Sequence, residues 1–398
     1  MTFETSETFE PIRLGVIGLG RAFMLTLPAI QADKRVRLVA ACAPRAKSRA
    51  AFEADFGGST YEKISDICND PNVEAVYIAT PHQMHAEHVI AAAKCGKHVL
   101  VDKPLAISME DGEAMVSACQ QSGVHLIVGP SHSFDAPVQQ ARSIIEREEL
   151  GKVRMIQSFN YTDFLYRPRR PEELVTNDGG GVIFSQAVHQ IDIVRLLAGG
   201  MGRQVTAMTG NWDPKRPTEG AYSALLSFEN GVFASLTYSG YAHFDSDEWL
   251  GWVGELGHDK NPEDYAPARR ALETVASQDA EVTLKQKRTF GDAPALKPQT
   301  HHEHFGPIII SCDHGDIRLT PDGIWKYGNK ERCFMPAPAM ASPRTTVIDA
   351  LVGALRKNSP PVQTGQWGLA SLEVCHAILA SAKSGKPVLL EKQTATNG

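Results

Sequence analysis

A lysine and a histidine lie at positions where their side chains could move a proton. Lys103 ends an apolar segment, 98–103, that is typical of a buried strand, and Pro104 follows it. Open α/β sheets bind ligands at the carboxyl ends of their strands, and burial beside positive charge lowers the pKa of a lysine until it can accept a proton. His189 lies in a predicted helix with Asp192 three residues later on the same face. Histidine suits acid–base chemistry near neutral pH, although a helical His–Asp pair taken alone is more often structural.

Residues 11–48 have the pattern of a dinucleotide-binding unit. An apolar strand at 12–18 leads through Gly18-Leu19-Gly20 into a predicted helix that begins at Arg21. Such glycines let the backbone turn tightly and approach a pyrophosphate, whose charge the helix N-terminus holds. Phe23 stands where a third glycine is usual, which implies a shifted helix or a side chain turned toward the ligand. The turn alone is equally consistent with another α/β protein. The expected cofactor contacts in this unit are Gly18, Gly20, Arg21, Ala22 and Phe23.

The end of the second strand bears on the choice between NAD and NADP. Ala43 stands where an acidic residue would accept hydrogen bonds from a free ribose 2′-hydroxyl. Arg45, Lys47 and Ser48 follow it and could bind a 2′-phosphate. We therefore expect NADP in preference to NAD, with Ala43 and Arg45 beside the adenosine ribose. The alternative is that Arg45 and Lys47 lie in solvent at a helix start and that NAD binds without the acidic contact.

Short apolar runs alternate with amphipathic segments over the first third of the chain. Strands that are apolar throughout and separated by helices are typical of a parallel sheet covered on both faces. The fold class predicted here is an α/β Rossmann domain, which we expect over residues 11–133. Its predicted strands are 12–18, 36–42, 73–80, 98–103 and 124–130.

The pattern changes after about residue 152 into strands joined by hairpin turns such as Asp322-Gly323. We expect an α+β C-terminal domain over 134–398, with a mostly antiparallel open sheet that serves substrate binding and oligomerisation. Residues 258–303 are polar and are predicted to be an insertion with a helical patch. Residues 343–398 are predicted to form helices that pack back onto the rest.

Composition excludes several kinds of partner. The chain has 398 residues and a formal net charge of −6, so it lacks the basic surface typical of nucleic-acid binding. No apolar run approaches the roughly 20 residues that span a bilayer, so no membrane association is expected. Its 7 cysteines never form a C-x-x-C pair, which indicates reduced thiols in a cytoplasmic protein. The histidine groups at 82–85 and 301–304 lack suitably spaced Cys or acidic ligands, so no metal is expected.

Two long segments, 75–106 and 179–200, resemble the Gfo/Idh/MocA family of glucose–fructose oxidoreductase and inositol dehydrogenase. The resemblance implies an NAD(P)-dependent oxidoreductase in which Lys103 and His189 handle the proton and Asp192 orients the histidine ring. It also implies that a set of residues near the fourth and fifth strands lies at the cofactor, with His85 bracing its helix start. That set is Thr80, Pro81, His85, Asp102 and Lys103.

The chain departs from the family pattern at three positions. Ser185 stands where the family has an aspartate four residues before the histidine, Ala187 replaces a frequent glycine, and Asp102 replaces a glutamate. Serine cannot hold an anion beside His189, which removes a carboxylate relay at that position. Within the family, the segments 185–197, 240–255 and 304–323 most resemble the dihydrodihydroxyphthalate dehydrogenases, which oxidise a phthalate cis-dihydrodiol to dihydroxyphthalate.

A cluster of arginines lies in the proline-rich segment 164–174. Guanidinium groups beside a pocket suit a carboxylate-bearing substrate through bidentate hydrogen bonds. A solvated basic loop or an intersubunit contact is an equal alternative. The expected substrate contacts are Asn160, Arg167, Arg169, Arg170, Ser185 and Asp192.

We therefore expect a dehydrogenase that oxidises a secondary alcohol of a small, anionic cyclic diol with NAD or NADP. The substrate predicted first is a phthalate cis-dihydrodiol. A sugar or inositol dehydrogenase or reductase is the alternative among enzymes, and a nucleotide-binding sensor without turnover is the alternative outside them. The free face of the antiparallel sheet favours a homodimer or homotetramer.

Overall fold

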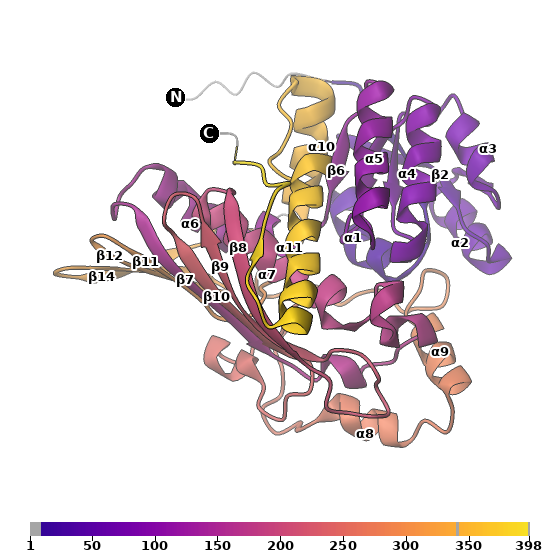
Figure 1. Cartoon of the computed structure of the whole chain (residues 1–398). Helices are drawn as coiled ribbons and strands as arrows, with labels where there is room; N and C mark the ends of the chain where they lie inside the picture. The colour runs from indigo at the N-terminus through magenta and orange to yellow at the C-terminus, as the bar shows by residue number, and fades with distance from the viewer. Residues whose placement is uncertain (1–8, 340–341, 397–398) are drawn as a thin grey trace.

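The chain forms two lobes, each built on one β-sheet, as Figure 1 shows for a computed structural model. The structure describes residues 9–339 and 342–396, so the last two residues of the predicted C-terminal domain lie outside it. The fold class is the predicted one: a Rossmann-type parallel sheet is followed by a mostly antiparallel sheet.

The first sheet has the strand order β3-β2-β1-β4-β5-β6, and its strand pairs are parallel. Its strands are β1 (Ile12–Ile17), β2 (Val36–Cys42), β3 (Ser59–Tyr61), β4 (Ala75–Ile78), β5 (His98–Val101) and β6 (Leu126–Val128). The helices between them are α1 (Arg21–Ala32), α2 (Ala46–Phe56), α3 (Ile64–Asn69), α4 (His85–Lys94) and α5 (Met109–Gln121). All residues of β4 are buried, as expected of an apolar strand with helices over both faces.

The second sheet has the order β14-β13-β12-β11-β7-β10-β9-β8-β15. Strands β7 and β10 pair in parallel and their other partners are antiparallel. Its strands are β7 (Val153–Tyr161), β8 (Gly202–Gly210), β9 (Ala221–Phe228), β10 (Phe233–Ser239), β11 (Ile308–Cys312), β12 (Gly315–Thr320), β13 (Gly323–Gly328), β14 (Arg332–Pro336) and β15 (Val388–Leu389).

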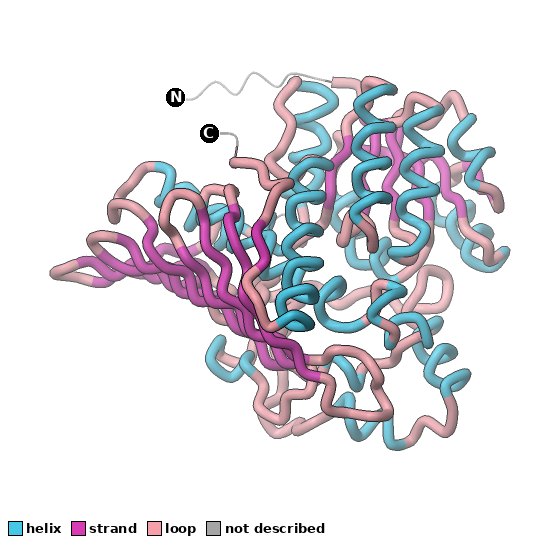
Figure 2. The backbone as a smooth tube through the Cα atoms, in the orientation of Figure 1, coloured by secondary structure: helices cyan, strands magenta, loops and turns pink. Residues whose placement is uncertain are grey.

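Helices cover one face of this second sheet and leave the other open, as Figure 2 shows. The covering helices are α6 (Ala136–Glu146), α7 (Val188–Ala198) and α11 (Gly365–Ser384). Buried and exposed residues alternate along β8 and β9, which is the period of a strand with one covered face. The predicted helix over 182–200 begins with a π turn at Ile183–Ala187 before α7.

The insertion at 258–303 contains two helices, α8 (Pro267–Glu273) and α9 (Gln278–Gln286). Figure 1 shows α8 at the bottom and α9 at the lower right. The sequence predicted α8 but missed α9, whose N-cap Ser277 accepts a hydrogen bond from the Ala280 amide. It also missed β3, which is only three residues long.

Helix α10 (Thr345–Lys357) returns to the first lobe and packs against α1. Its residues Val347, Ile348 and Leu351 are fully buried in the core on that side of the first sheet. No helix among the described residues is long and apolar enough to cross a membrane.

Candidate active site

The turn between β1 and α1 is shaped for a close ligand. Gly18 has φ +97°, and a Cβ there would lie 2.8 Å from the carbonyl oxygen of Ala79, so a larger residue does not fit. Gly20 precedes the first residue of α1, and a Cβ there would meet nothing closer than 3.7 Å. The helix start therefore presents its amides beside an uncrowded backbone turn, as a dinucleotide pyrophosphate requires.

Phe23 corrects one sequence-based expectation. Its side chain has no exposed surface and stacks edge-to-face on Phe290, with ring centroids 5.5 Å apart. The phenyl ring therefore lies in the core instead of turning toward a ligand. Phe290 comes from the insertion, and its amide donates to the carbonyl of Leu19 within the glycine turn, 3.2 Å away.

Two arginines near the start of α1 are close enough for their charges to interact. Arg21 belongs to that helix, and Arg288 comes from the end of the insertion. Burial and the nearby positive charge of Arg288 lower the pKa of Arg21. Neither side chain forms an ion pair with another described residue, so both are available to an anion such as a pyrophosphate. The glycine turn and this cationic pair fit an NAD(P) cofactor.

A histidine braces the two loops that carry the family motifs. His85 is fully buried at the start of α4, and its ring nitrogens lie 2.9 Å from the carbonyl oxygen of Pro104 and 3.1 Å from that of Thr80. This ties the loop after β4, with Thr80 and Pro81, to the loop after β5. Asp102 accepts a hydrogen bond from the hydroxyl of Tyr77 at 3.1 Å.

Lys103 lies at the carboxyl end of β5 and reaches across to the second lobe. Its ammonium donates to the backbone carbonyl of Ser185 at 2.9 Å, in the π turn before α7. Burial lowers the pKa of Lys103 from its ordinary 10.5, and the charges of Asp102 and Glu255 oppose that shift. Ser185 thus meets the lysine through its backbone, where the family has a carboxylate side chain.

His189 is buried on the first turn of α7, close enough to Lys103 for the two charges to interact. Burial, followed by the charges of Lys103 and His132, holds the pKa of His189 well below 6.5, so the imidazole is neutral at neutral pH. Its Nδ1 has no hydrogen-bond partner among the described residues.

Beside His189 lies an ion-pair cluster that the sequence did not predict. The ring of His132 packs against that of His189 with centroids 4.7 Å apart. His132 Nδ1 lies 2.7 Å from Asp135, and its Nε2 lies 3.7 Å from Glu255. Although burial opposes it, the two carboxylates raise the pKa of His132 to about 10. His132 comes soon after β6, so the rule that ligands bind at strand ends could have found it.

The three predicted arginines have different surroundings. Arg167 is paired with Asp163 at 3.1 Å and Glu255 at 3.6 Å, and Arg170 is paired with Glu172 at 3.0 Å. Arg169 stacks on the ring of Phe164 at 3.6 Å. It forms no ion pair within 4 Å among the described residues, and its Nη2 donates to the carbonyl of Phe164 at 2.6 Å. Its Nε, like that of Arg170, is buried without a hydrogen-bond partner. Burial lowers the pKa of Arg169 to about 10.

Asp192 and Asn160 have partners outside the proton-handling pair. The Asp192 carboxylate accepts hydrogen bonds from the Ser131 hydroxyl, at 2.5 Å, and from the indole of Trp367. It forms no hydrogen bond with His189, which corrects the expectation that it orients that ring. Asn160 accepts from the hydroxyl of Ser246 at 2.9 Å and is almost fully buried.

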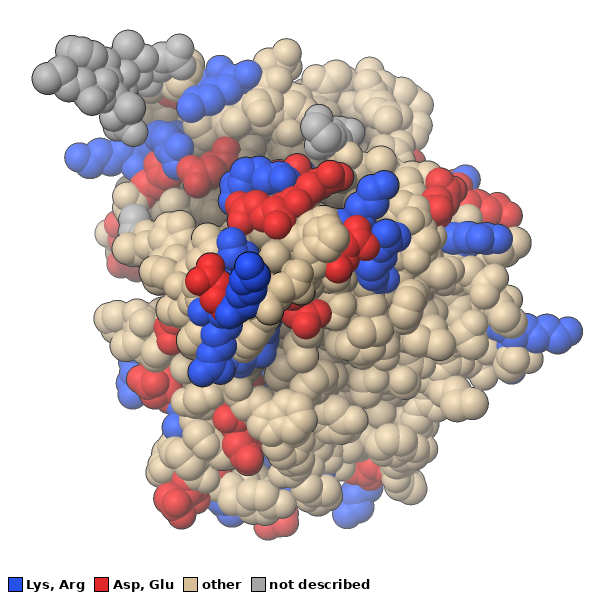
Figure 3. Space-filling view, turned by 90° about the vertical axis from the view of Figure 1, so that its left-hand side faces the viewer, with Lys and Arg blue, Asp and Glu red and all other residues tan. Residues whose placement is uncertain are grey.

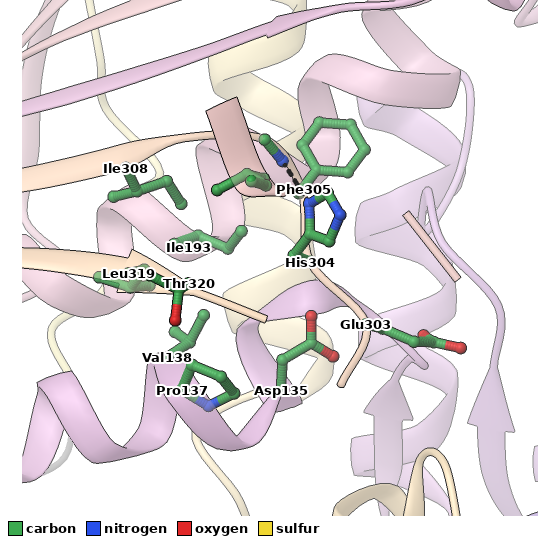
Figure 4. A pocket seen from close by; sticks show the side chains of 12 residues that line it. Asp135, Pro137, Val138, Ile193, Glu303, His304, Phe305, Ile308, Leu319 and Thr320 are labelled. Carbon is green, nitrogen blue, oxygen red and sulfur yellow. Dashed lines mark hydrogen bonds between the residues drawn. The ribbon is translucent and has the colours of Figure 1, made fainter. Parts of the chain in front are cut away.

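The only group of metal-type ligands within the described ranges is His132, Asp135 and Glu303, whose ligand atoms lie within 4.8 Å of one another. Arg344 lies 3.2 Å from Glu303, so cations of the chain already meet these carboxylates. Figure 4 shows Asp135 and Glu303 at a pocket whose other side is formed by Ile193, Ile308 and Leu319. Its volume of about 10 Å³ is too small for a substrate.

A larger cleft of about 780 Å³ borders the site through Arg167. Arg288, Lys260, Phe244 and Trp252 are among the residues that line it. Acidic residues such as Asp245 and Glu248 also line it, so the charge of this cleft is mixed and its aromatic walls are its main feature for a ring compound.

Two family descriptions match the chain. "Oxidoreductase family, NAD-binding Rossmann fold" matches residues 12–130, and "GFO/IDH/MocA C-terminal domain" matches residues 138–258. The resemblance noted in the sequence is therefore confirmed.

Curated and solved relatives agree with this assignment. A 1-carboxy-3-chloro-3,4-dihydroxycyclohexa-1,5-diene dehydrogenase of Comamonas testosteroni is 46% identical over 384 residues, which cover 95% of this chain and 96% of that protein. A solved structure from Bordetella bronchiseptica RB50, which carries the name of a dehydrogenase, is 40% identical with a TM-score of 0.91 and covers 96% of this chain and 100% of its own. A levoglucosan dehydrogenase of Pseudarthrobacter phenanthrenivorans is 31% identical over 52% of this chain and 53% of that protein. The chain belongs to the Gfo/Idh/MocA family of NAD(P)-dependent oxidoreductases.

Proposed function

We propose that the protein oxidises a carboxylated cis-dihydrodiol ring, such as that of phthalate, to the corresponding catechol. The named activity of the Comamonas testosteroni relative supports this substrate class, because that substrate is also a carboxylated dihydroxycyclohexadiene. The observation that carries the proposal is Arg169. A buried guanidinium without a carboxylate partner, close enough to Lys103 to lower its pKa, is suited to a substrate carboxylate.

Lys103 and His189 are proposed to divide the handling of the substrate hydroxyl. A proton acceptor works best when its pKa lies near the working pH. Burial moves the pKa of Lys103 down toward neutrality and moves that of His189 further below it. Lys103 is therefore the proton acceptor, and the neutral imidazole of His189 accepts a hydrogen bond that orients the hydroxyl.

The reaction balances without any further reagent. NAD(P)⁺ held at the glycine turn would supply the acceptor for the hydride of the carbinol carbon. Lys103 takes the hydroxyl proton, so that the C–O bond becomes a carbonyl. The resulting hydroxydienone loses its remaining ring proton and gains one on oxygen, which gives the aromatic catechol.

The open face of the second sheet is proposed to pair with another copy of the chain, giving a homodimer or homotetramer. Met208, Leu225 and Phe233 lie on β8, β9 and β10 with 79, 57 and 48% of their surface exposed. Figure 3 shows a broad area without Lys, Arg, Asp or Glu on the side of the molecule from which this sheet projects. Uncharged faces with exposed large side chains are typical of interfaces.

The substrate class can be tested by comparing two diols that differ only in the carboxylate. The protein would be mixed with NAD⁺ or NADP⁺ and either a carboxylated cis-dihydrodiol or the same diol without its carboxyl group, and reduced nicotinamide would be followed by absorbance. We expect turnover of the first and at least a tenfold lower kcat/KM for the second. Turnover of glucose, levoglucosan or inositol but not of either diol would replace this function with a sugar or inositol dehydrogenase.

A matched pair of arginine variants tests the residue that carries the proposal. Arg169→Gln should raise KM for the carboxylated diol roughly 10- to 100-fold, because a charge-assisted hydrogen bond contributes about 1.5–3 kcal/mol. Arg170→Gln, whose guanidinium is already paired with Glu172, should change it by less than about threefold. Equal effects of the two substitutions would contradict the assignment.

A further inference from the structure

The adenosine end of the cofactor site lacks an acidic residue on the first lobe itself. Strand β2 ends at Cys42, and the residue after it is the buried Ala43, which offers only backbone groups. Arg45, Lys47 and Ser48 follow, the set that a 2′-phosphate would need. The charges on this lobe alone would favour NADP.

The insertion places a carboxylate at this position. Asp292 forms ion pairs with both Arg45 and Lys47. The Ser48 hydroxyl donates to the carbonyl of Phe290 at 2.8 Å. Arg45 also donates to the hydroxyl of Thr289. Each of the three side chains suited to a 2′-phosphate is therefore already bound by residues 289–292.

The position of this segment is fixed by apolar packing and not by the ion pairs alone. The Phe290 ring is buried between Phe23 on α1 and Phe56 at the end of α2, with centroids 5.5 and 6.0 Å away. The segment 289–292 is therefore anchored on the side chain that stands in place of the usual third glycine. Phe23 departs from the glycine pattern, and Asp292 stands in for the missing acid. The two belong together, because Phe290 packs on Phe23 and lies two residues before Asp292.

We infer that Asp292 is the residue that selects NAD over NADP, supplied by the insertion in place of an acidic residue after β2. A ribose 2′-hydroxyl can donate a hydrogen bond to this carboxylate. A 2′-phosphate, with a charge of about −1.5 to −2 near neutral pH, is repelled by it and has to displace it from Arg45 and Lys47. The inference rests on a dinucleotide binding across the β1–α1 turn, and it reverses the preference that the sequence alone suggests.

Binding measurements test this without any substrate. Dissociation constants for NADH and NADPH would be measured by titration calorimetry on the full chain and on Asp292→Asn. We expect the unsubstituted protein to bind NADH at least tenfold more tightly than NADPH. Asp292→Asn should tighten NADPH binding at least tenfold and weaken NADH binding only a few-fold, because Arg45 and Lys47 then face the phosphate freely.

Two further variants make the outcome specific. Asp264→Asn removes a carboxylate of the same insertion that is paired with Arg270, and it should leave both constants unchanged. Adding Arg45→Gln and Lys47→Gln to Asp292→Asn should abolish the gained NADPH affinity.

Equal or tighter NADPH binding by the unsubstituted protein would overturn the role of Asp292. An unchanged ratio of the two constants in Asp292→Asn, or equal losses of both affinities, would overturn it as well. Failure of the unsubstituted protein to bind either dinucleotide would instead contradict the proposed function.

Discussion

At the scale of single residues, burial is the reason for the proposed division of proton handling between Lys103 and His189. Lys103 and His189 are both buried, and burial lowers the pKa of each. The same physical effect makes the lysine a better proton acceptor near neutral pH and the histidine a worse one. The residue types alone suggested that Lys103 and His189 act together. Their burial supports the different role proposed for each.

Loss of the lysine amine should slow the chemical step. Lys103→Ala should lower kcat by about 10²–10⁴-fold, the usual contribution of a positioned acid or base. The circular dichroism spectrum serves as the control for folding and should not change. Activity within a factor of about three of the unsubstituted protein would rule out Lys103 as the acceptor.

The pH profile should carry the signature of this lysine. Because the deprotonated amine is the proposed acceptor, kcat/KM should rise with pH to a midpoint below 10.5, the ordinary pKa of lysine. The neutral His189 should add no inflection near pH 6.5, since its pKa lies well below that value. An inflection near 6.5 that disappears in His189→Gln would assign the proton to the histidine instead.

His132 should link stability to pH. Its pKa is about 10 in the folded protein and about 6.5 when unfolded. A raised pKa stabilises the fold fully below pH 6.5, and that contribution is lost as pH rises toward 10. The melting temperature should therefore fall from pH 6.5 to 10 more steeply than in His132→Gln, as differential scanning calorimetry would measure. Parallel curves for the two proteins would contradict the ion pairs with Asp135 and Glu255.

At the scale of elements, the strands end where the chemistry is needed. The loops after β1, β4, β5 and β6 carry Gly18, Thr80, Lys103 and His132 respectively. The second lobe contributes His189 through the first turn of α7, and the preceding π turn presents a carbonyl to the lysine. The site therefore depends on how these two lobes are held together.

The glycine turn gives a prediction at this scale. Gly18→Ala should destabilise the protein by about 1–3 kcal/mol, because φ is +97° and the new methyl would lie 2.8 Å from a carbonyl oxygen. Gly20→Ala, with ordinary φ and no close neighbour, should cost only about 0.5 kcal/mol. Chemical denaturation without cofactor measures the free energy of unfolding of both variants. Equal losses of stability would show that a side chain at Gly18 does not strain the turn.

The sequence predicted the elements better than the contacts between them. Apolar runs were enough to locate five of the strands of the first sheet, since such runs are specified locally. Glu255, Arg288 and Asp292 could not be found in this way, because the role proposed for each depends on residues far away in the chain. Asp192 was misjudged for the same reason, since Ser131 and Trp367 lie outside its own helix.

At the scale of the whole molecule, the open sheet face determines the proposed assembly. Leu225→Arg puts a charge in the middle of the uncharged face and should convert the proposed homo-oligomer to a monomer. Val175→Arg, at an exposed loop position outside the sheet, should not. Light scattering coupled to size exclusion measures the mass, and an unsubstituted protein that is already monomeric would refute the proposal.

The return of α10 to the first lobe has a consequence for how this protein is made. Val347, Ile348 and Leu351 complete a core whose other members, on α1 and β1, leave the ribosome long before them. Until the last part of the chain has been synthesised, that apolar groove beside α1 stays uncovered. A fragment cut after residue 133 would keep it uncovered permanently, and we expect it to aggregate unless the α10 peptide is supplied in trans.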